Sequence, residues 1–430
     1  MLRLNAFSLR DGTRLCGLPF SDCSWSQSWN ESGSMSVTIP LSDDIASLDL
    51  DTILVEQQTA LALLDGDAVI HAGPILESPS WDAETRRLSV SCGGGWSLFE
   101  WRLVLDSLLE SRDIDGELLI DEDNPGAEWT VAYQGTAGDI ARSLIQLAQR
   151  WGDLPVDVSA YDGSQSTTVR WDGWEFPVMA DAMRDALDRE DGGQLRFDPY
   201  LTVDGRLRWR ERWSLTGVTD RETPFKWNTM VPGQRIRFTG CGSGGGAWVN
   251  EVWASGGKSD DVLYMYRVRD AEAINSTGVL VQSGDSNAGT GDSLAALHSY
   301  ARNKLSASRR DRTWNLEVGA EWRPHVGDHV ELRVNDPFLH SWRADGTRTG
   351  TVVTLVITDV SGDAGGDWLT VACRETNGTV NGVRSAVSDP MRQLAQRLRA
   401  TERRATRANG ATRSQTYQVV RKLSQLRGKG

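Results

Sequence analysis

The most constraining feature of the sequence is a set of short segments in which apolar and polar residues alternate, separated by turns rich in Gly, Asp and Pro. Such segments fill residues 1–100 and return from residue 236 onward, for example at 34–39, 87–92 and 313–318. A period of two residues is typical of half-buried β-strands. Both regions are therefore predicted to be β-rich. The aromatic side chains expected in the core of the first region are Trp25, Trp29, Trp81 and Trp96.

Residues 101–235 have a different pattern. Thr136 and Asp139 have the spacing of a helix capping box, and apolar residues follow at helical spacing. A second helix is expected from Val178, and Asp204-Gly205 is a strong signal for a β-hairpin turn. This segment is predicted to be a mixed α/β insertion.

Strand patterns resume after the insertion, with one helix expected at 292–306. In the last segment Asp389 is placed as a helix N-cap, Pro390 as the first helical residue and Gly410 as a break between two helices. The sequence thus predicts an α+β, mainly β fold with two similar β-barrel-like domains. The predicted domains are 1–100 (first β-barrel-like domain), 101–235 (mixed α/β insertion), 236–385 (second β-barrel-like domain) and 386–430 (basic helical C-terminal tail).

The two β-rich regions contain similar short motifs. Leu88-Ser-Val-Ser-Cys92 and Leu369-Thr-Val-Ala-Cys373 both read Leu-x-Val-x-Cys. The expected strand at 53–56 and the segment at 73–75 likewise match segments at 330–333 and 350–352. Alternation places Leu, Val and Cys of each motif on one strand face, so a coincidence between two ordinary strands is the alternative. We favour an internal duplication, in which case a closed trimer would present six similar domains around one axis.

Charge is distributed unevenly along the chain. The net charge is −13, but residues 391–430 contain nine Arg, two Lys and one Glu, a local charge of +10, which leaves −23 for residues 1–390. An acidic body repels nucleic acid, so only the tail could attract it. No apolar run is long enough to span a bilayer and no secretion signal is evident, so we expect synthesis in a cytoplasm and no stable membrane insertion.

A search for catalytic motifs gives no candidate. The sequence lacks H-E-x-x-H, G-x-S-x-G and the phosphate-binding G-x-x-x-x-G-K-[ST], and the glycine-rich stretch at 240–246 has no lysine to hold a phosphate. We predict a protein that is not an enzyme, with no catalytic or cofactor-binding residues and no cofactor.

Metal and disulfide signals are equally weak. His325 and His329 share a strand face but have no third ligand at suitable spacing. The acidic stretch at 113–123 has its glycine at the wrong position for an EF-hand loop. Of five scattered cysteines only Cys16 and Cys23 are close enough to suggest a disulfide or a metal site, and buried thiols are the better interpretation. No metal site is predicted.

Several segments together resemble the tail-tip hub proteins of bacteriophages, also called baseplate-hub-like or tail-associated minor tail proteins, particularly those of actinobacterial siphophages. The opening stretch at 17–40, the stretch at 248–256, and the helix at 292–306 followed by 314–318 and 324–330 carry the likeness, which spans most of residues 1–385. Their order along the chain is more specific than any single motif.

The resemblance implies a homotrimeric ring at the virion tail tip that joins the sixfold tail tube to threefold tip proteins and helps DNA delivery. It also implies contacts with distal tail or tail tube proteins, the tape-measure protein, other minor tail proteins and transient DNA in the channel. Eighteen Trp and many carboxylates leave two alternatives: a tail-associated cell-wall or glycan hydrolase, or a carbohydrate-binding adhesion module.

Overall fold

The computed structural model describes residues 2–376 with internal gaps. The undescribed internal residues are 43–44, 46–47, 115–116, 119–128, 164–166, 173–175, 189–191, 244–248, 260–261, 286–296, 299–300, 303, 306–311, 337–338 and 343–347. The predicted helical tail at 386–430 therefore lies outside the described residues, as does most of the acidic stretch at 113–123. Within the described ranges, the helices are all too short or too polar to cross a bilayer.

The first β region consists of two sheets that share a core. One sheet has the order β2–β1–β5–β6, and the strands β3, β4, β8 and β7 form the facing layer. Leu61 of β5 and Val37 of β4 are both fully buried in this core. The bounds are β1 (Leu2–Ser8), β2 (Arg14–Leu18), β3 (Asp22–Ser28), β4 (Ser34–Pro40), β5 (Thr59–Asp65), β6 (Ala68–Pro74), β7 (Ser80–Asp82) and β8 (Arg87–Cys92).

The second β region is built around its own core, which contains Trp314, Leu332 and Val371. Its strands pair in the order β16–β22–β24–β25–β21–β17, and β23 extends β24. The predicted α+β, mainly β fold class is confirmed. The bounds are β16 (Phe225–Asn228), β17 (Ile236–Ser243), β21 (Arg312–Gly319), β22 (His329–Val334), β23 (His340–Trp342), β24 (Arg348–Asp363) and β25 (Trp368–Glu375), with a short helical turn η5 (Ala320–Trp322).

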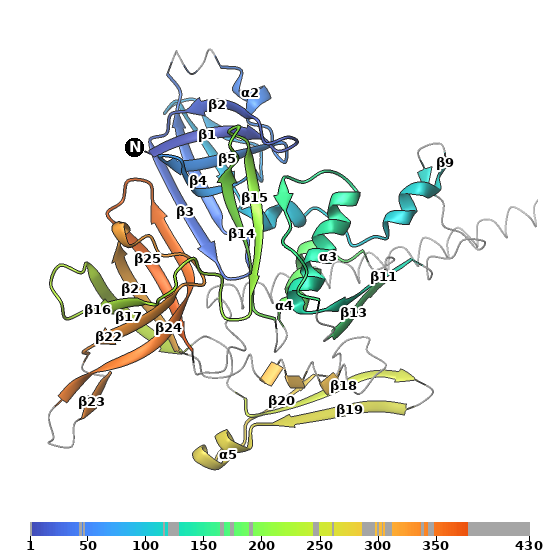
Figure 1. Cartoon of the computed structure of the whole chain (residues 1–430), viewed down its shortest axis with the longest axis vertical. Coiled ribbons are helices and arrows are strands. Elements are labelled where there is room, and N and C mark those ends of the chain that lie inside the picture. The colour runs from blue at the N-terminus through green and yellow to red at the C-terminus, as the bar shows by residue number, and fades with distance from the viewer. Residues whose placement is uncertain are drawn as a thin grey trace, which may run out of the picture. The chain divides into compact units, whose positions relative to one another are not determined.

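The long strand β24 connects the two regions. It pairs with β22 along its first half, and with β25 on one side and β3 on the other along its second half. One continuous path of eight strands results, β17–β21–β25–β24–β3–β4–β8–β7. Figure 1 shows β24 running beside β3.

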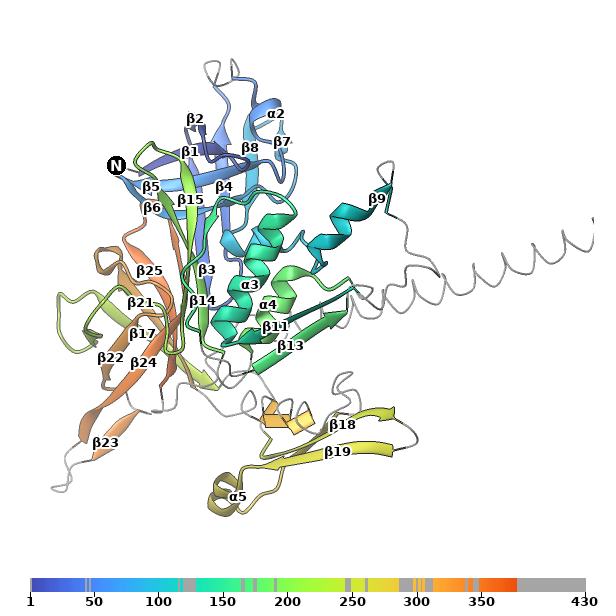
Figure 2. The same cartoon turned by 45° about the vertical axis from the view of Figure 1, so that its right-hand side comes forward.

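The predicted insertion contains two helices that cover the outer face of the first region. The strand β5 is buried on both faces, because Ala60 and Ala62 contact the same core as Ile140 and Met183. Figure 2 shows α3 and α4 lying next to each other. The bounds are η1 (Gly95–Phe99), η2 (Ser107–Arg112), β9 (Asp113–Ile114), β10 (Glu117–Leu118), β11 (Thr130–Gly135), α3 (Ala137–Arg150), β12 (Val156–Asp157), β13 (Thr167–Asp172), α4 (Met179–Leu187), β14 (Gln194–Leu201) and β15 (Leu207–Ser214).

A further small unit lies in sequence between β17 and β21. Its sheet has the order β19–β18–β20 and one face packs against Leu297 and Ala301, which are helical. Most of the helix predicted at 292–306 lies outside the described residues. The bounds are β18 (Glu251–Ser259), β19 (Val262–Arg269), α5 (Ala271–Thr277) and β20 (Gln282–Asp285).

Two local predictions are wrong. Residues 53–56 were expected to be a strand, but Leu50–Ile53 forms the short helix α2, because Leu50, Ile53 and Leu54 are at helical spacing and all contact the first core. The four tryptophans do not share that core. Trp29 packs in the second core, Trp96 packs with the insertion, and Trp81 is 49% exposed on β7.

Candidate assembly interface

The eight-stranded path has two different faces. Along β3, β4 and β8, Cys23, Val37 and Val90 are buried in the core, as the alternation predicts. The opposite face of these strands carries small hydroxyl side chains that are exposed or half-buried. They are Ser24, Ser26, Ser34, Ser36, Thr38, Ser89 and Ser91.

The pairing of β24 with β3 joins the two β regions, and we call it the internal joint. Asp363 pairs with Ser24 and Gly362 with Trp25 in an antiparallel register. Backbone hydrogen bonds from Ala364 N to Cys23 O (2.6 Å) and from Trp29 N to Thr358 O (2.9 Å) extend it at both ends. A main-chain ladder of this kind fixes the register of one region against the other.

The two β regions have equivalent strand pairings. In the second region, β22 pairs with β24, β24 with β25, β25 with β21, and β21 with β17. In the first region, the corresponding pairs are β5 with β6, β7 with β8, β8 with β4, and β4 with β3. The single strand β24 thus takes the places of both β6 and β7. One difference is that β1 is antiparallel to β5, whereas β16 is parallel to β22. We call the two strand sets repeat 1 (β1 and β3–β8) and repeat 2 (β16, β17, β21, β22, β24 and β25).

A sequence match accompanies this equivalence. Residues 80–92 align with 361–373 without a gap, and six of these thirteen positions are identical: Ser, Asp, Ala, Leu, Val and Cys. Both segments form a hairpin with Leu88 opposite Trp81 and Leu369 opposite Gly362. The Leu-x-Val-x-Cys motif is the second half of this match. The first half is not evident from the other motifs, because they align the two regions through 53–56, which is not a strand.

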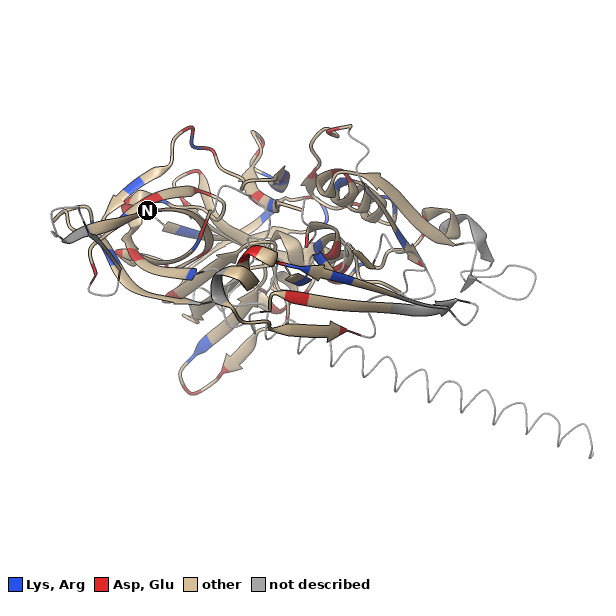
Figure 3. Cartoon of the chain, turned by 90° about the horizontal axis from the view of Figure 1, so that it is seen from below, with Lys and Arg blue, Asp and Glu red and all other residues tan. Residues whose placement is uncertain are grey.

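The path ends in two strands whose outer edges have no partner among the described residues, β7 and β17. The β7 edge carries the exposed Trp81 and Asp82, and the β17 edge carries Arg237 and the half-buried Cys241. An exposed strand edge presents free backbone donors and acceptors and is a template for pairing with another chain. Figure 3 shows that acidic and basic residues are interspersed along the described elements.

The insertion links the two repeats through buried polar contacts. Asn30, in the turn after β3, donates from Nδ2 to Gly193 O (3.0 Å) and accepts from Leu195 N (2.8 Å). Gln194 lies between these two residues, and its Nε2 donates to Val326 O (3.2 Å). Because buried polar groups are costly to leave unpaired, these contacts hold the repeats in one arrangement.

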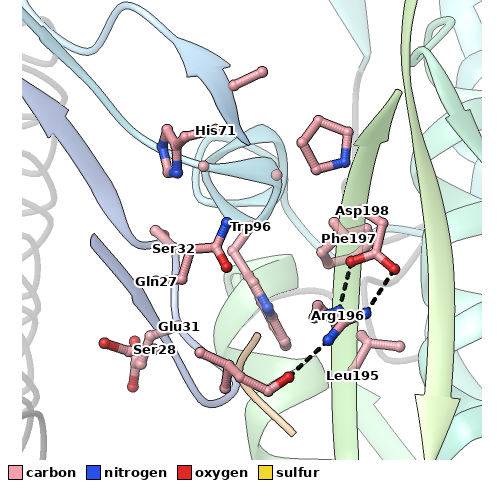
Figure 4. A pocket seen from close by; sticks show the side chains of 15 residues that line it. Gln27, Ser28, Glu31, Ser32, His71, Trp96, Leu195, Arg196, Phe197 and Asp198 are labelled. Atoms are coloured by element: carbon pink, nitrogen blue, oxygen red, sulfur yellow. Dashed lines mark hydrogen bonds and ion pairs between the residues drawn. The ribbon is translucent and has the colours of Figure 1, made fainter. Parts of the chain in front are cut away.

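A small cavity of about 50 Å³ lies beside these contacts. Figure 4 shows Trp96 and His71 on one side of it and Arg196 on the other, where Arg196 bonds Asp198 and the carbonyl of Val326. Sites for small-molecule ligands are commonly ~300 Å³ or larger. The cavity therefore matches the size of a few water molecules and not that of a substrate.

Of the two histidines noted in the sequence, His325 lies in a turn that Asp328 stabilises. Asp328 accepts a hydrogen bond from His325 N (2.9 Å) and another from the Thr219 hydroxyl, so its carboxylate is already used within the protein. His325 is exposed and His329 is half-buried on β22. Among the described residues, no group of three or more His, Cys, Asp and Glu side chains is placed to hold a metal ion.

All five cysteines are described and are free thiols. Cys16 lies on β2 and Cys23 on β3, which belong to different sheets. Burial raises the pKa of Cys23 to about 11, so this thiol stays neutral at physiological pH. The glycine-rich stretch at 240–246 begins within β17, and its last three residues lie outside the described ranges.

Comparison with known proteins shows which solved structures have a similar fold. No protein-family model matches the sequence, and no curated protein matches it. Solved structures do match. Among them are the tail protein from Neisseria meningitidis MC58, with 12% identity and a TM-score of 0.50 over 88% of this chain and 97% of that chain, and the 43 kDa tail protein of prophage MuSo2 from Shewanella oneidensis, with 11% identity and a TM-score of 0.50 over 87% and 98%. The chain has the fold of these tail proteins.

Proposed function

We propose that this protein is a structural subunit of a phage tail tip, a homotrimeric hub that joins the sixfold tail tube to threefold tip proteins. The observation that carries the proposal is the internal joint, which sets two equivalent repeats side by side in one sheet. The fold shared with tail proteins supports a place in the virion. The resemblance to hub proteins of actinobacterial siphophages implies that three copies assemble and that they lie at the tail tip.

Symmetry explains why two repeats in one chain would be useful. A ring of three chains contains six repeats, and the eight strands of each path add up to twenty-four around the ring. Such a ring offers near-equivalent surfaces at sixfold positions on the tube side and threefold positions elsewhere. No catalytic residue is needed for this role, and the domains predicted at 1–100 and 236–385 would be the two tube-docking domains.

The hydroxyl-rich face is suited to line the channel of such a ring. Lys and Arg side chains bind DNA by neutralising phosphates and releasing counterions. On this face of β3, β4 and β8 small hydroxyl groups predominate, and the charged residues Asp22 and Arg87 lie at its margin. DNA would therefore pass without being held. The tape-measure protein and other minor tail proteins would be the remaining partners.

Co-assembly with the tail tube tests this function. The purified full-length chain is mixed with the tail tube protein encoded in the same phage genome, and the product is imaged by electron microscopy. We expect a ring capping one end of the tube, with its channel continuous with the tube. A chain that leaves the tube ends bare, or that degrades purified cell-wall polymer, would overturn the proposal.

A further inference from the structure

The two open strand edges have the features of complementary halves of one contact. Building on the proposed ring, we propose that β7 of one copy pairs with β17 of the next copy, in the antiparallel register that β24 makes with β3 inside the chain. We call this contact the seam. It is a heterologous contact, because two different edges meet, and heterologous contacts form rings when the rotation between copies closes.

The β7 side of the register follows from the hairpins. Gly362 of β24 lies opposite Leu369, and Trp81 of β7 lies opposite Leu88. Leu369 and Leu88 occupy the same place in the aligned segments 361–373 and 80–92. Trp81 is therefore the counterpart of Gly362.

The β17 side follows from the two inner strands. In repeat 1, Trp25 lies opposite Met35, which lies opposite Cys92. In repeat 2, Cys241 lies opposite Trp314, which lies opposite Cys373. Cys241 is thus the counterpart of Trp25. Because Gly362 faces Trp25 at the internal joint, Trp81 of one copy should face Cys241 of the next at the seam.

Side-chain size supports this register. At the internal joint the large Trp25 lies beside Gly362, where a Cβ would meet Leu369 at 2.4 Å and would make an ordinary contact with the Trp25 ring at 3.8 Å. At the seam the sizes are exchanged, with a large Trp81 on β7 and a smaller Cys241 on β17. Both contacts therefore combine one indole with one small residue. The seam would also bury Trp81, which is 49% exposed in the single chain.

Charge supports the choice of partner edge. The β7 hairpin carries Asp82 and Glu84, followed by Arg86 and Arg87 toward β8. The β17 edge carries Arg235 and Arg237, which also pair with Glu321 and Glu317 within the chain. The Arg237 side chain is 61% exposed and stacks on the Trp368 ring at 4.0 Å, which holds it at this edge. Pairing β7 with β17 brings Asp82 and Glu84 toward Arg237, whereas pairing two β17 edges brings the arginines of both copies together.

A cysteine at position 81 tests the seam directly. Trp81→Cys in the full-length chain should form an intersubunit disulfide with the native Cys241 when a copper–phenanthroline oxidant accepts the two electrons and the two protons are released to solvent. We expect covalent dimers and trimers on a non-reducing gel. The matched control, Ser80→Cys, points to the other sheet face and should give about ten-fold less product.

Two further measurements test whether the cross-link arises from pairing between β7 and β17. Trp81→Cys combined with Cys241→Ser should abolish the cross-link, and in the unmodified protein the backbone amides of β7 and β17 should be protected from hydrogen exchange in the oligomer. A trimer by solution mass that neither cross-links through position 81 nor protects these edges would overturn the seam while leaving the hub intact. A chain that stays monomeric at micromolar concentration would overturn both.

Discussion

At the scale of single residues, the close approach of β6 to the segment that follows β8 requires a glycine at position 73. A Cβ built on Gly73 of β6 would lie 1.8 Å from Gly93 O, a backbone atom that cannot move independently. We expect Gly73→Ala to reduce the free energy of unfolding by about 3 kcal/mol, as overpacked sites do. The control is Gly284→Ala in β20, where a Cβ meets nothing within 4 Å. Urea unfolding of both variants measures the difference, and equal stabilities would contradict the packing.

A buried histidine in the same strand makes stability depend on pH. His71 is buried, with its Nε2 3.0 Å from Gly93 O, and desolvation lowers its pKa to about 4 from an ordinary 6.5. Between these values the unfolded chain binds a proton that the folded chain does not, so stability falls as the pH drops from about 6.5 to 4.

His71→Gln removes this proton linkage. Relative to its own stability at pH 7, the variant should lose about 2–3 kcal/mol less than the unmodified protein at pH 4.5, since each pKa unit corresponds to about 1.4 kcal/mol. Urea titrations at the two pH values measure it. Parallel losses in both proteins would show that this imidazole is already protonated in the folded state.

At the scale of elements, helix α3 begins with the cap that the sequence predicts. The Thr136 hydroxyl accepts from Asp139 N at 3.0 Å, but the Asp139 carboxylate does not complete a capping box, because it bonds Arg142 at 3.0 Å and the amides of 162 and 163. We expect Thr136→Ala to cost about 1 kcal/mol and Thr136→Ser to restore most of it. Chemical denaturation followed by circular dichroism measures both, and an unchanged alanine variant would contradict the cap.

The elements also show how far the sequence could predict the fold. Alternation was sufficient for β8 and β25, because each buries one face only, and helical spacing was sufficient for α3 and α4. Alternation does not say which strands pair. The internal joint connects residues more than three hundred positions apart, and the exposed Trp81 looked like a core residue because its partner belongs, on our proposal, to another chain.

At the scale of the whole molecule, the insertion and the internal joint together present two repeats as one unit. The polar contacts of Asn30 and Gln194 hold the repeats, and the long strand β24 makes their sheets continuous. A single chain would then carry two of six positions in a ring. The β7 and β17 edges of the eight-stranded path have no partner among the described residues, and we assign them to contacts between neighbouring copies.

The mass of the full-length protein in solution tests this account most directly. Native mass spectrometry, or light scattering at micromolar concentration, should give three times the 47.4 kDa mass of one chain. Charge reversal at the β7 edge, Asp82→Lys with Glu84→Lys, should shift the population toward single chains, because like charges then meet Arg235 and Arg237. A uniform 47.4 kDa species, or an assembly that this reversal leaves unchanged, would contradict a ring closed by pairing between these two edges.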